Sequence, residues 1–130
     1  AAAESYFKCM GDVVAATDAD IIGHFDLISK FCEVGVDLDM TNPRYRRAYT
    51  DAIDRLIPYG KPFEVNTGAI SRGYRTSPYP PMPMTRYIAS QGGSIIFTSD
   101  SHHVDNIAFQ FDVWEPVYRA FGTKVLECPV

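Results

Sequence analysis

The sequence predicts an α/β fold in which parallel strands alternate with helices. Four short apolar runs rich in β-branched residues are separated by segments whose apolar residues recur at helical spacing. That alternation is typical of parallel βα units. Four strands are too few to close a barrel of about eight strands, so we expect a partial parallel (βα) barrel. No linker or internal repeat divides residues 1–130, which we treat as a single domain.

In the first half of the chain we expect a helix, a short strand and a second helix. Residues 2–16 have apolar residues close to helical spacing, and Gly11 weakens that helix without ending it. Residues 20–23 read as a buried strand, and residues 27–40 as an irregular loop. The second helix is capped by Thr41 or Asn42 and ends at Pro58 and Gly60. Its apolar stripe comprises Tyr45, Ala48, Tyr49, Ala52, Ile53 and Leu56.

In the second half, strands are expected at residues 63–66, 94–98 and 124–128. A long loop over residues 67–83 contains glycine, arginine and several prolines, and its tyrosines favour an ordered conformation. Helices are expected at residues 84–91 and 112–120, with a helical turn at 104–109. The last helix is predicted to be capped by Asp112 and to bury Val113, Val117 and Phe121.

Composition narrows the class of protein. The 130 residues have a formal net charge of -4 and a single basic concentration at Arg44, Arg46 and Arg47, which argues against a nucleic-acid partner. No apolar run approaches the ~20 residues that span a membrane. Three widely spaced cysteines favour free thiols and a cytoplasmic location. The first residues lack the order of a signal peptide and look like the interior of a helix, so we expect the chain to begin inside a larger protein.

Polar side chains follow three of the predicted strands. Asp100 and His102 follow residues 94–98, His24 and Asp26 follow residues 20–23, and Glu64 and Asn66 end the strand at 63–66. Parallel strands bring such groups to one edge of the sheet. Imidazole and carboxylate groups there are natural ligands for a divalent cation.

Each of these groups also has a purely structural interpretation. Asp-x-His is a common turn sequence, and a lone histidine such as His24 is more often a hydrogen-bonded core residue. Glu64 can orient a histidine or pair with Arg72. His103 is expected to face solvent.

Arg72 and Arg75, in the long loop beside that edge, suggest anion binding, because arginine matches phosphate oxygens in a bidentate way. The alternative is that both are ordinary surface arginines, and for Arg75 the two interpretations weigh equally. A metal site beside these arginines fits metal-assisted hydrolysis of a phosphate ester. The sequence contains no pattern typical of a Ser-His-Asp triad, a phosphate-binding glycine loop or a dinucleotide fingerprint.

Three blocks resemble the histidinol-phosphatase branch of the polymerase and histidinol phosphatase (PHP) superfamily. They are Asp20-Ile-Ile-Gly-His-Phe-Asp-Leu-Ile-Ser-Lys-Phe31, Phe63-Glu-Val-Asn-Thr-Gly-Ala-Ile-Ser-Arg-Gly-Tyr74 and Gly92-Gly-Ser-Ile-Ile-Phe-Thr-Ser-Asp-Ser-His102. The resemblance implies a distorted α/β barrel, a trinuclear centre of divalent zinc, manganese or iron, and hydrolysis of L-histidinol phosphate in histidine biosynthesis. His24, Asp100 and His102 would then be metal ligands, with Asp100 and His102 also catalytic, and Arg72 would hold the substrate phosphate. Arg75 is also expected to bind the phosphorylated substrate, because it lies in the same loop.

One departure from that family is large. Its His-x-His motif on the opening strand has no counterpart here, and His24, His102 and His103 are the only histidines. The chain therefore resembles the C-terminal half of a PHP-type barrel and is expected to be inactive alone. It would need a missing N-terminal half or self-association. Two other interpretations remain: a PHP phosphoesterase acting on nucleotides, and a non-catalytic remnant that binds a metal or packs against a partner.

Overall fold

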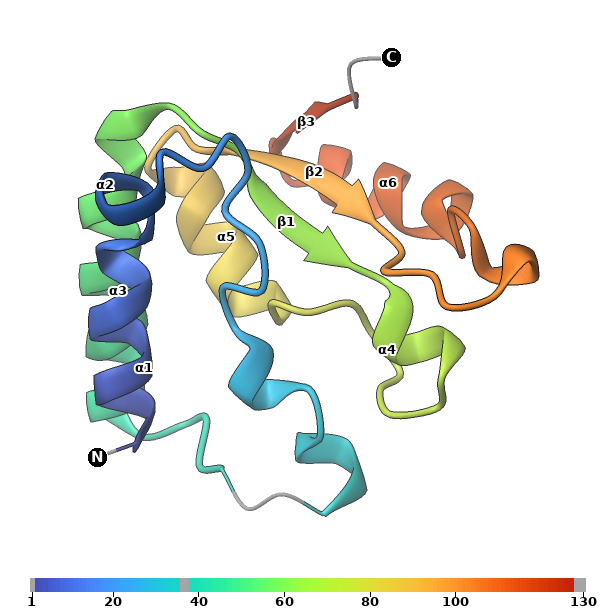
Figure 1. Ribbon diagram of the computed structural model, residues 1–130, viewed down its shortest axis with the longest axis horizontal. Coiled ribbons are helices and arrows are strands. Elements are labelled where there is room, and N and C mark those ends of the chain that lie inside the picture. Colours follow the sequence, from blue (N-terminus) through green and yellow to red (C-terminus); the bar gives the residue numbers. More distant parts are fainter. Residues whose placement is uncertain (1, 36–37, 128–130) are drawn as a thin grey trace.

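The computed structural model describes residues 2–35 and 38–127, and it is a mixed α/β structure built on a parallel sheet (Figure 1). Three strands form the sheet in the order β1-β2-β3, and both pairings are parallel. This arrangement is compatible with a partial α/β barrel. The strands are β1 Phe63–Asn66, β2 Ser94–Thr98 and β3 Lys124–Leu126, and the helices are α1 Ala2–Gly11, α2 Val13–Thr17, α3 Pro43–Leu56, α4 Gly68–Ser71, α5 Met82–Ser90 and α6 Phe111–Ala120.

The predicted strand at residues 20–23 is wrong, because only Ile22 pairs, through a single parallel bridge to Phe63. Ile22 donates to the Pro62 carbonyl and accepts from the Glu64 amide, both at 2.9 Å. Pro62 has no N–H to extend the ladder backwards. In the other direction, the Asn66 amide donates instead to the carbonyl of Tyr79 at 2.8 Å. The segment therefore lies beside β1 without becoming a full strand.

The first predicted helix is interrupted where Gly11 ends α1, and it resumes as α2. A Cβ at Gly11 would lie 2.8 Å from Nη1 of Arg55 and 3.5 Å from the Cα of Ala52. The missing side chain thus lets α1 pack closely against α3. The two helices lie side by side (Figure 1), with Phe7 buried between them.

The second predicted helix is confirmed as α3. Asn42 is the N-cap and accepts from the amide of Arg44 at 2.9 Å, with Pro43 at the first helical position. All but one of the predicted stripe residues are buried, and Ala48 is partly buried. They join Phe7, Phe25 and Phe63 in the larger of two core clusters.

Helix α6 is confirmed, and Phe121 packs against the sheet as predicted, but the prediction that Val113 and Val117 are buried is wrong. Tyr118 is buried, whereas Val113 and Val117 are 53% and 39% exposed. Trp114, Tyr118 and Phe121 form the stripe that packs on Val65, Ile95 and Val125 of the sheet. The helix begins at Phe111 with Gln110, not Asp112, at the N-cap. Aromatic side chains bury more apolar area than valines, which explains why this stripe faces the sheet.

The remaining elements follow the predictions in part. The loop at residues 67–83 is ordered and contains α4, and the turn after β2 is a 3₁₀ turn at Val104–Asn106. Cys9 and Cys32 are free thiols, and Cys128 lies outside the described residues. Within the described ranges, no helix combines the length and apolar character needed to cross a membrane.

Candidate active site at the strand ends

The C-terminal ends of β1 and β2 and the turn after Ile22 meet at one edge of the sheet, as the parallel pairing requires. Asn66 of β1 lies opposite Thr98 of β2. His24 follows the Ile22 bridge, and Asp100 lies two residues beyond β2. The structure thus places the predicted polar residues of three separate segments along a shared edge.

Glu64 connects these segments through its two carboxylate oxygens. Its Oε1 accepts from the His24 amide at 3.0 Å and lies 3.3 Å from the Nδ1 of the same histidine. Its Oε2 accepts from Thr98 Oγ1 at 2.8 Å. Asn66 donates to Oε1 at 3.3 Å. Glu64 therefore orients His24, one of its two predicted roles, and in the described residues it forms no ion pair with Arg72.

Arg72 forms a second group with Asp100 and His102. Its Nη1 donates to the Asp100 carbonyl at 2.9 Å and lies 2.9 Å from His102 Nδ1. Its Nη2 lies 3.4 Å from Asp100 Oδ2. Asp100 has a left-handed backbone with φ of 43°, an uncommon conformation that for aspartate occurs mostly in turns. The guanidinium thus holds the sharp turn that presents Asp100 and His102.

The position of Arg72 depends on Gly68 at the start of α4. A Cβ on this residue would lie 2.4 Å from the Ser99 carbonyl oxygen and 3.0 Å from Arg72 Nη2. Only glycine permits this approach of α4 to the end of β2. The same close contact brings Arg72 within reach of Asp100.

Tyr79 is a site residue that sequence reasoning did not identify. Its backbone pairs with Asn66 in an antiparallel bridge, and its hydroxyl lies 3.4 Å from His24 Nδ1. Burial has the largest effect on the Tyr79 hydroxyl and raises its pKa. The nearby Glu64 and Asp100 carboxylates raise this pKa further, while Arg72 lowers it. The Tyr79 hydroxyl therefore stays protonated and can donate a hydrogen bond beside His24. The prolines and tyrosines of this loop predicted an ordered conformation, but they did not predict that the loop would pair with β1 at Tyr79.

Asp26 and Arg75 lie beneath this edge, in the protein interior. The carboxylate of Asp26 accepts from the Tyr45 hydroxyl at 2.7 Å. Burial raises the pKa of Asp26 to about 6, against the lowering effect of Ser29, Tyr45 and Arg75. Arg75 is only 7% exposed and donates to the carbonyls of Ser29 at 2.9 Å and Ser77 at 3.0 Å. In this structure Arg75 is a buried structural arginine, and its role toward a substrate stays a prediction.

The side chain of His103 is exposed and interacts with the 3₁₀ turn that follows it. It caps the following 3₁₀ turn by accepting from the Asp105 amide at 3.2 Å, and it lies 3.3 Å from the Asp105 carboxylate. The expectation that it faces solvent is confirmed.

The donor types at the edge suit a divalent cation, but the ligand set is small. His24 lies with Glu64, and Asp100 lies with His102 and Arg72, as two separate groups. Across residues 2–35 and 38–127, no cluster of three or more His, Cys, Asp or Glu side chains is arranged to hold a metal ion. These residues alone therefore do not form a three-metal centre, although they can contribute ligands to one.

No protein-family model matches this chain. Among curated proteins, a "Probable histidinol-phosphatase" of Schizosaccharomyces pombe (strain 972 / ATCC 24843) is 27% identical over 107 residues. The match covers 82% of this chain and 35% of the relative. The chain thus spans about a third of that relative's length, and the similarity supports a histidinol-phosphatase-like relationship.

Proposed function

We propose that this chain is part of a metal-dependent phosphomonoester hydrolase that converts L-histidinol phosphate to L-histidinol in histidine biosynthesis. The name of the yeast relative supports the substrate, and the chemistry of the strand-end residues supports the reaction class. The observation on which the proposal rests is the contact of Arg72 with both Asp100 and His102. It supports the proposal because a guanidinium, which suits phosphate oxygens, lies beside two candidate metal ligands.

Each residue has a proposed role in this reaction. Arg72, rather than the buried Arg75, binds the phosphate oxygens through its guanidinium. His24, Asp100 and His102 are proposed ligands for zinc, manganese or iron, and bound ions would supply charge neutralisation at the phosphoryl group. Glu64 orients His24, and the protonated Tyr79 hydroxyl donates a hydrogen bond toward the bound phosphate ester.

The ligands that this chain lacks must come from elsewhere. We propose that they are supplied either by an N-terminal half belonging to the same protein or by a second copy of this chain. The trinuclear centre is proposed only for such an assembly. As an unassociated monomer, the 130-residue chain should release phosphate from L-histidinol phosphate no faster than the buffer does.

The first test is the metal content per chain, measured by elemental analysis of protein purified without chelator. About three ions per chain would mean that the chain completes its site by association. At most about one weakly held ion, lost in His24→Ala and Asp100→Ala, would mean that the ligands are present but the site is unassembled. If the chain binds no zinc, manganese or iron in a way that depends on these residues, the proposed function is wrong.

Phosphate binding gives a second, independent test of the same site. Titration of L-histidinol phosphate into the chain should shift the NMR signals of residues 98–102, and Arg72→Gln should weaken this binding by about tenfold or more. Arg119→Gln is the matched control, because Arg119 pairs with Glu115 on α6. If both variants lose the same amount of affinity for L-histidinol phosphate, Arg72 does not bind the phosphate.

A non-catalytic role is the second candidate, and the small ligand set of the described residues favours it. In that case the chain would bind one metal ion or only pack against a partner. His102→Ala would then change neither metal content nor stability, whereas the phosphatase proposal requires that it lower metal content. Profiling a completed enzyme against nucleotides and L-histidinol phosphate would separate the histidinol phosphatase from a PHP enzyme acting on nucleotides.

A further inference from the structure

Two tyrosine hydroxyls from different helices hold the turn that presents His24. Tyr6 of α1 donates to the His24 carbonyl and accepts from the Leu27 amide at 3.3 Å. Tyr45 of α3 donates to the Asp26 carboxylate at 2.7 Å. Both contacts fall within the few residues around His24, although they originate 18 and 19 positions away on opposite sides along the sequence.

The backbone of His24 needs such support because it is left-handed, with φ of 54°. Residues other than glycine adopt this conformation only when their surroundings impose it. Glu64 accepts from the His24 amide at 3.0 Å, on one side of the Cα atom. Tyr6 holds the carbonyl on the other side. The two contacts together fix the direction of the Cα–Cβ bond, and hence where the imidazole can lie.

The Tyr45 contact is unusual for a group that serves stability alone. Asp26 is 0% exposed, and its Oδ2 makes no hydrogen bond within the described residues. Burying a carboxylate with few donors is unfavourable, and such groups are often retained for a reason other than stability. Here the carboxylate anchors the turn two residues after His24 to α3.

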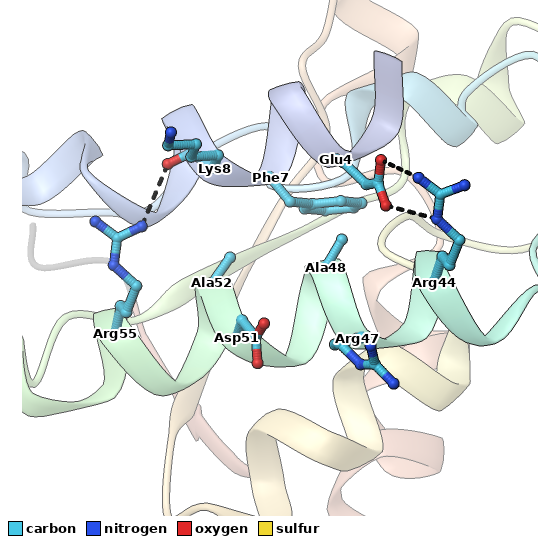
Figure 2. Close-up of a pocket in the computed structure, with 9 residues that line it drawn as sticks. All are labelled: Glu4, Phe7, Lys8, Arg44, Arg47, Ala48, Asp51, Ala52 and Arg55. Atoms are coloured by element: carbon cyan, nitrogen blue, oxygen red, sulfur yellow. Dashed lines mark hydrogen bonds and ion pairs between the residues drawn. The ribbon is translucent and has the colours of Figure 1, made fainter. Parts of the chain in front are cut away.

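The pairing of α1 with α3 lets both tyrosines reach the same turn. Phe7 packs against Tyr45 at 5.5 Å and against Phe25, within the turn, at 5.3 Å between ring centroids. On the outer side, a groove of about 430 Å³ runs between the helices. Figure 2 shows Glu4 paired with Arg44 and the Arg55 guanidinium donating to the Lys8 carbonyl across this groove. The positions of α1 and α3 therefore determine where Tyr6 and Tyr45 hold the turn that carries His24.

We infer that Tyr6 and Tyr45 are positioning residues for His24, and that their hydroxyls, not only their rings, set the direction of its imidazole toward the strand-end site. The inference rests on the proposed function in one respect, namely that His24 is a metal ligand of that site. Neither tyrosine is assigned a contact with the substrate. Residues that orient a metal ligand typically change metal affinity 10–100-fold when they are mutated.

The test compares Tyr6→Phe and Tyr45→Phe with Tyr49→Phe as the matched control. Tyr49 belongs to the same aromatic cluster as Tyr45, but its hydroxyl accepts from Arg46 at 3.0 Å and not from the turn. NMR of the metal-free chain would follow the His24 backbone carbon shifts and its ring contact with Tyr79. His102 and His103 serve as internal references. Calorimetry with Zn²⁺ would then measure metal affinity.

Both turn variants should move the His24 signals and weaken Zn²⁺ binding by about tenfold or more, while Tyr49→Phe and the two reference histidines stay unchanged. Unchanged His24 signals in both turn variants, or equal changes in Tyr49→Phe, would overturn the inference. Because the substitutions act from different helices, one remains informative if the other prevents folding. If wild-type chain binds no Zn²⁺ but the His24 signals still move, the proposed function fails and the positioning role stands.

Discussion

Gly68 shows how a single residue sets the geometry of the candidate site. Because Gly68 has no side chain, α4 can lie close to the Ser99 carbonyl. This close packing brings the Arg72 guanidinium within hydrogen-bond distance of the Asp100 carbonyl. Because the obstruction is a backbone atom, no rotamer change can relieve it. The geometry of Arg72 therefore depends on a residue that has no functional group of its own.

We expect Gly68→Ala to separate α4 from the end of β2. The new Cβ, 2.4 Å from the Ser99 oxygen, should lower the free energy of unfolding by about 1–3 kcal/mol. It should also abolish the Arg72 contacts. Urea unfolding measures the first effect, and the NMR signal of the Arg72 Nε–H group, together with phosphate binding, measures the second.

Gly73→Ala is the control within the same loop. Gly73 has φ of 76° and no heavy atom within 4 Å of a built Cβ, so the substitution should cost about 1–2 kcal/mol through backbone conformation alone. Arg72 should keep its contacts with Asp100. A Gly68→Ala protein with unchanged Arg72 signals would contradict the role given to this glycine.

Sequence could place some site residues and not others, for a physical reason. His24 and Asp100 each follow an apolar run, so their place at one edge of the sheet could be predicted locally, although the run before His24 forms a single bridge and not a strand. Tyr6 and Tyr79 reach the site only through contacts with His24 that are 18 and 55 positions away in sequence. Arg75 has the same loop context as Arg72, yet it points to Ser29 in the interior. Composition alone does not distinguish the two arginines.

Helix α6 shows the same limit at the scale of elements. The predicted stripe of Val113, Val117 and Phe121 satisfies helical spacing, and so does the observed one, in which Trp114 and Tyr118 replace the two valines. Periodicity therefore predicts the helix but allows two orientations. The sheet accepts the aromatic stripe because it buries more apolar area. Similarly, apolar runs predicted the three paired strands, while the end of pairing at Ile22 depends on Pro62 and Tyr79.

Tyr118 anchors α6 to the sheet and makes this contact sensitive to high pH. Burial raises the pKa of its hydroxyl from 10.0 to about 12, with Thr85 and Arg75 opposing the rise. Between pH 10 and 12 the unfolded chain releases this proton and the folded chain keeps it. Stability from this group is therefore complete below pH 10 and is lost as pH rises toward 12, by roughly 3 kcal/mol.

Tyr118→Phe should remove this part of the pH dependence. Urea unfolding at pH 8 and at higher pH would show wild type losing stability relative to the variant. Tyr59→Phe is the control, because Tyr59 is 47% exposed. A constant difference between wild type and Tyr118→Phe across this range would contradict the buried, protonated state of Tyr118.

For the whole molecule, one edge of the sheet is covered and the other is open. Beside β1 lies the Ile22 segment, whereas β3 pairs only with β2 in the described residues. Helix α6, which contacts β3, exposes Val113 and Val117. Val104 and Ile107, between β2 and α6, are 72% and 66% exposed. An unpaired sheet edge and exposed apolar side chains each favour association with another chain.

We therefore expect the isolated chain to associate as its concentration rises, which sedimentation velocity would detect. Replacing both Val113 and Val117 with Glu should shift the distribution toward monomer, because two charges would be buried without partners in the contact. Tyr59→Glu introduces charge at an exposed apolar residue after α3, away from this edge, and should leave the distribution unchanged. A monomer at every concentration would show that β3 is not a contact edge. For the proposed metal centre, the further ligands would then have to come from a second part of a longer protein.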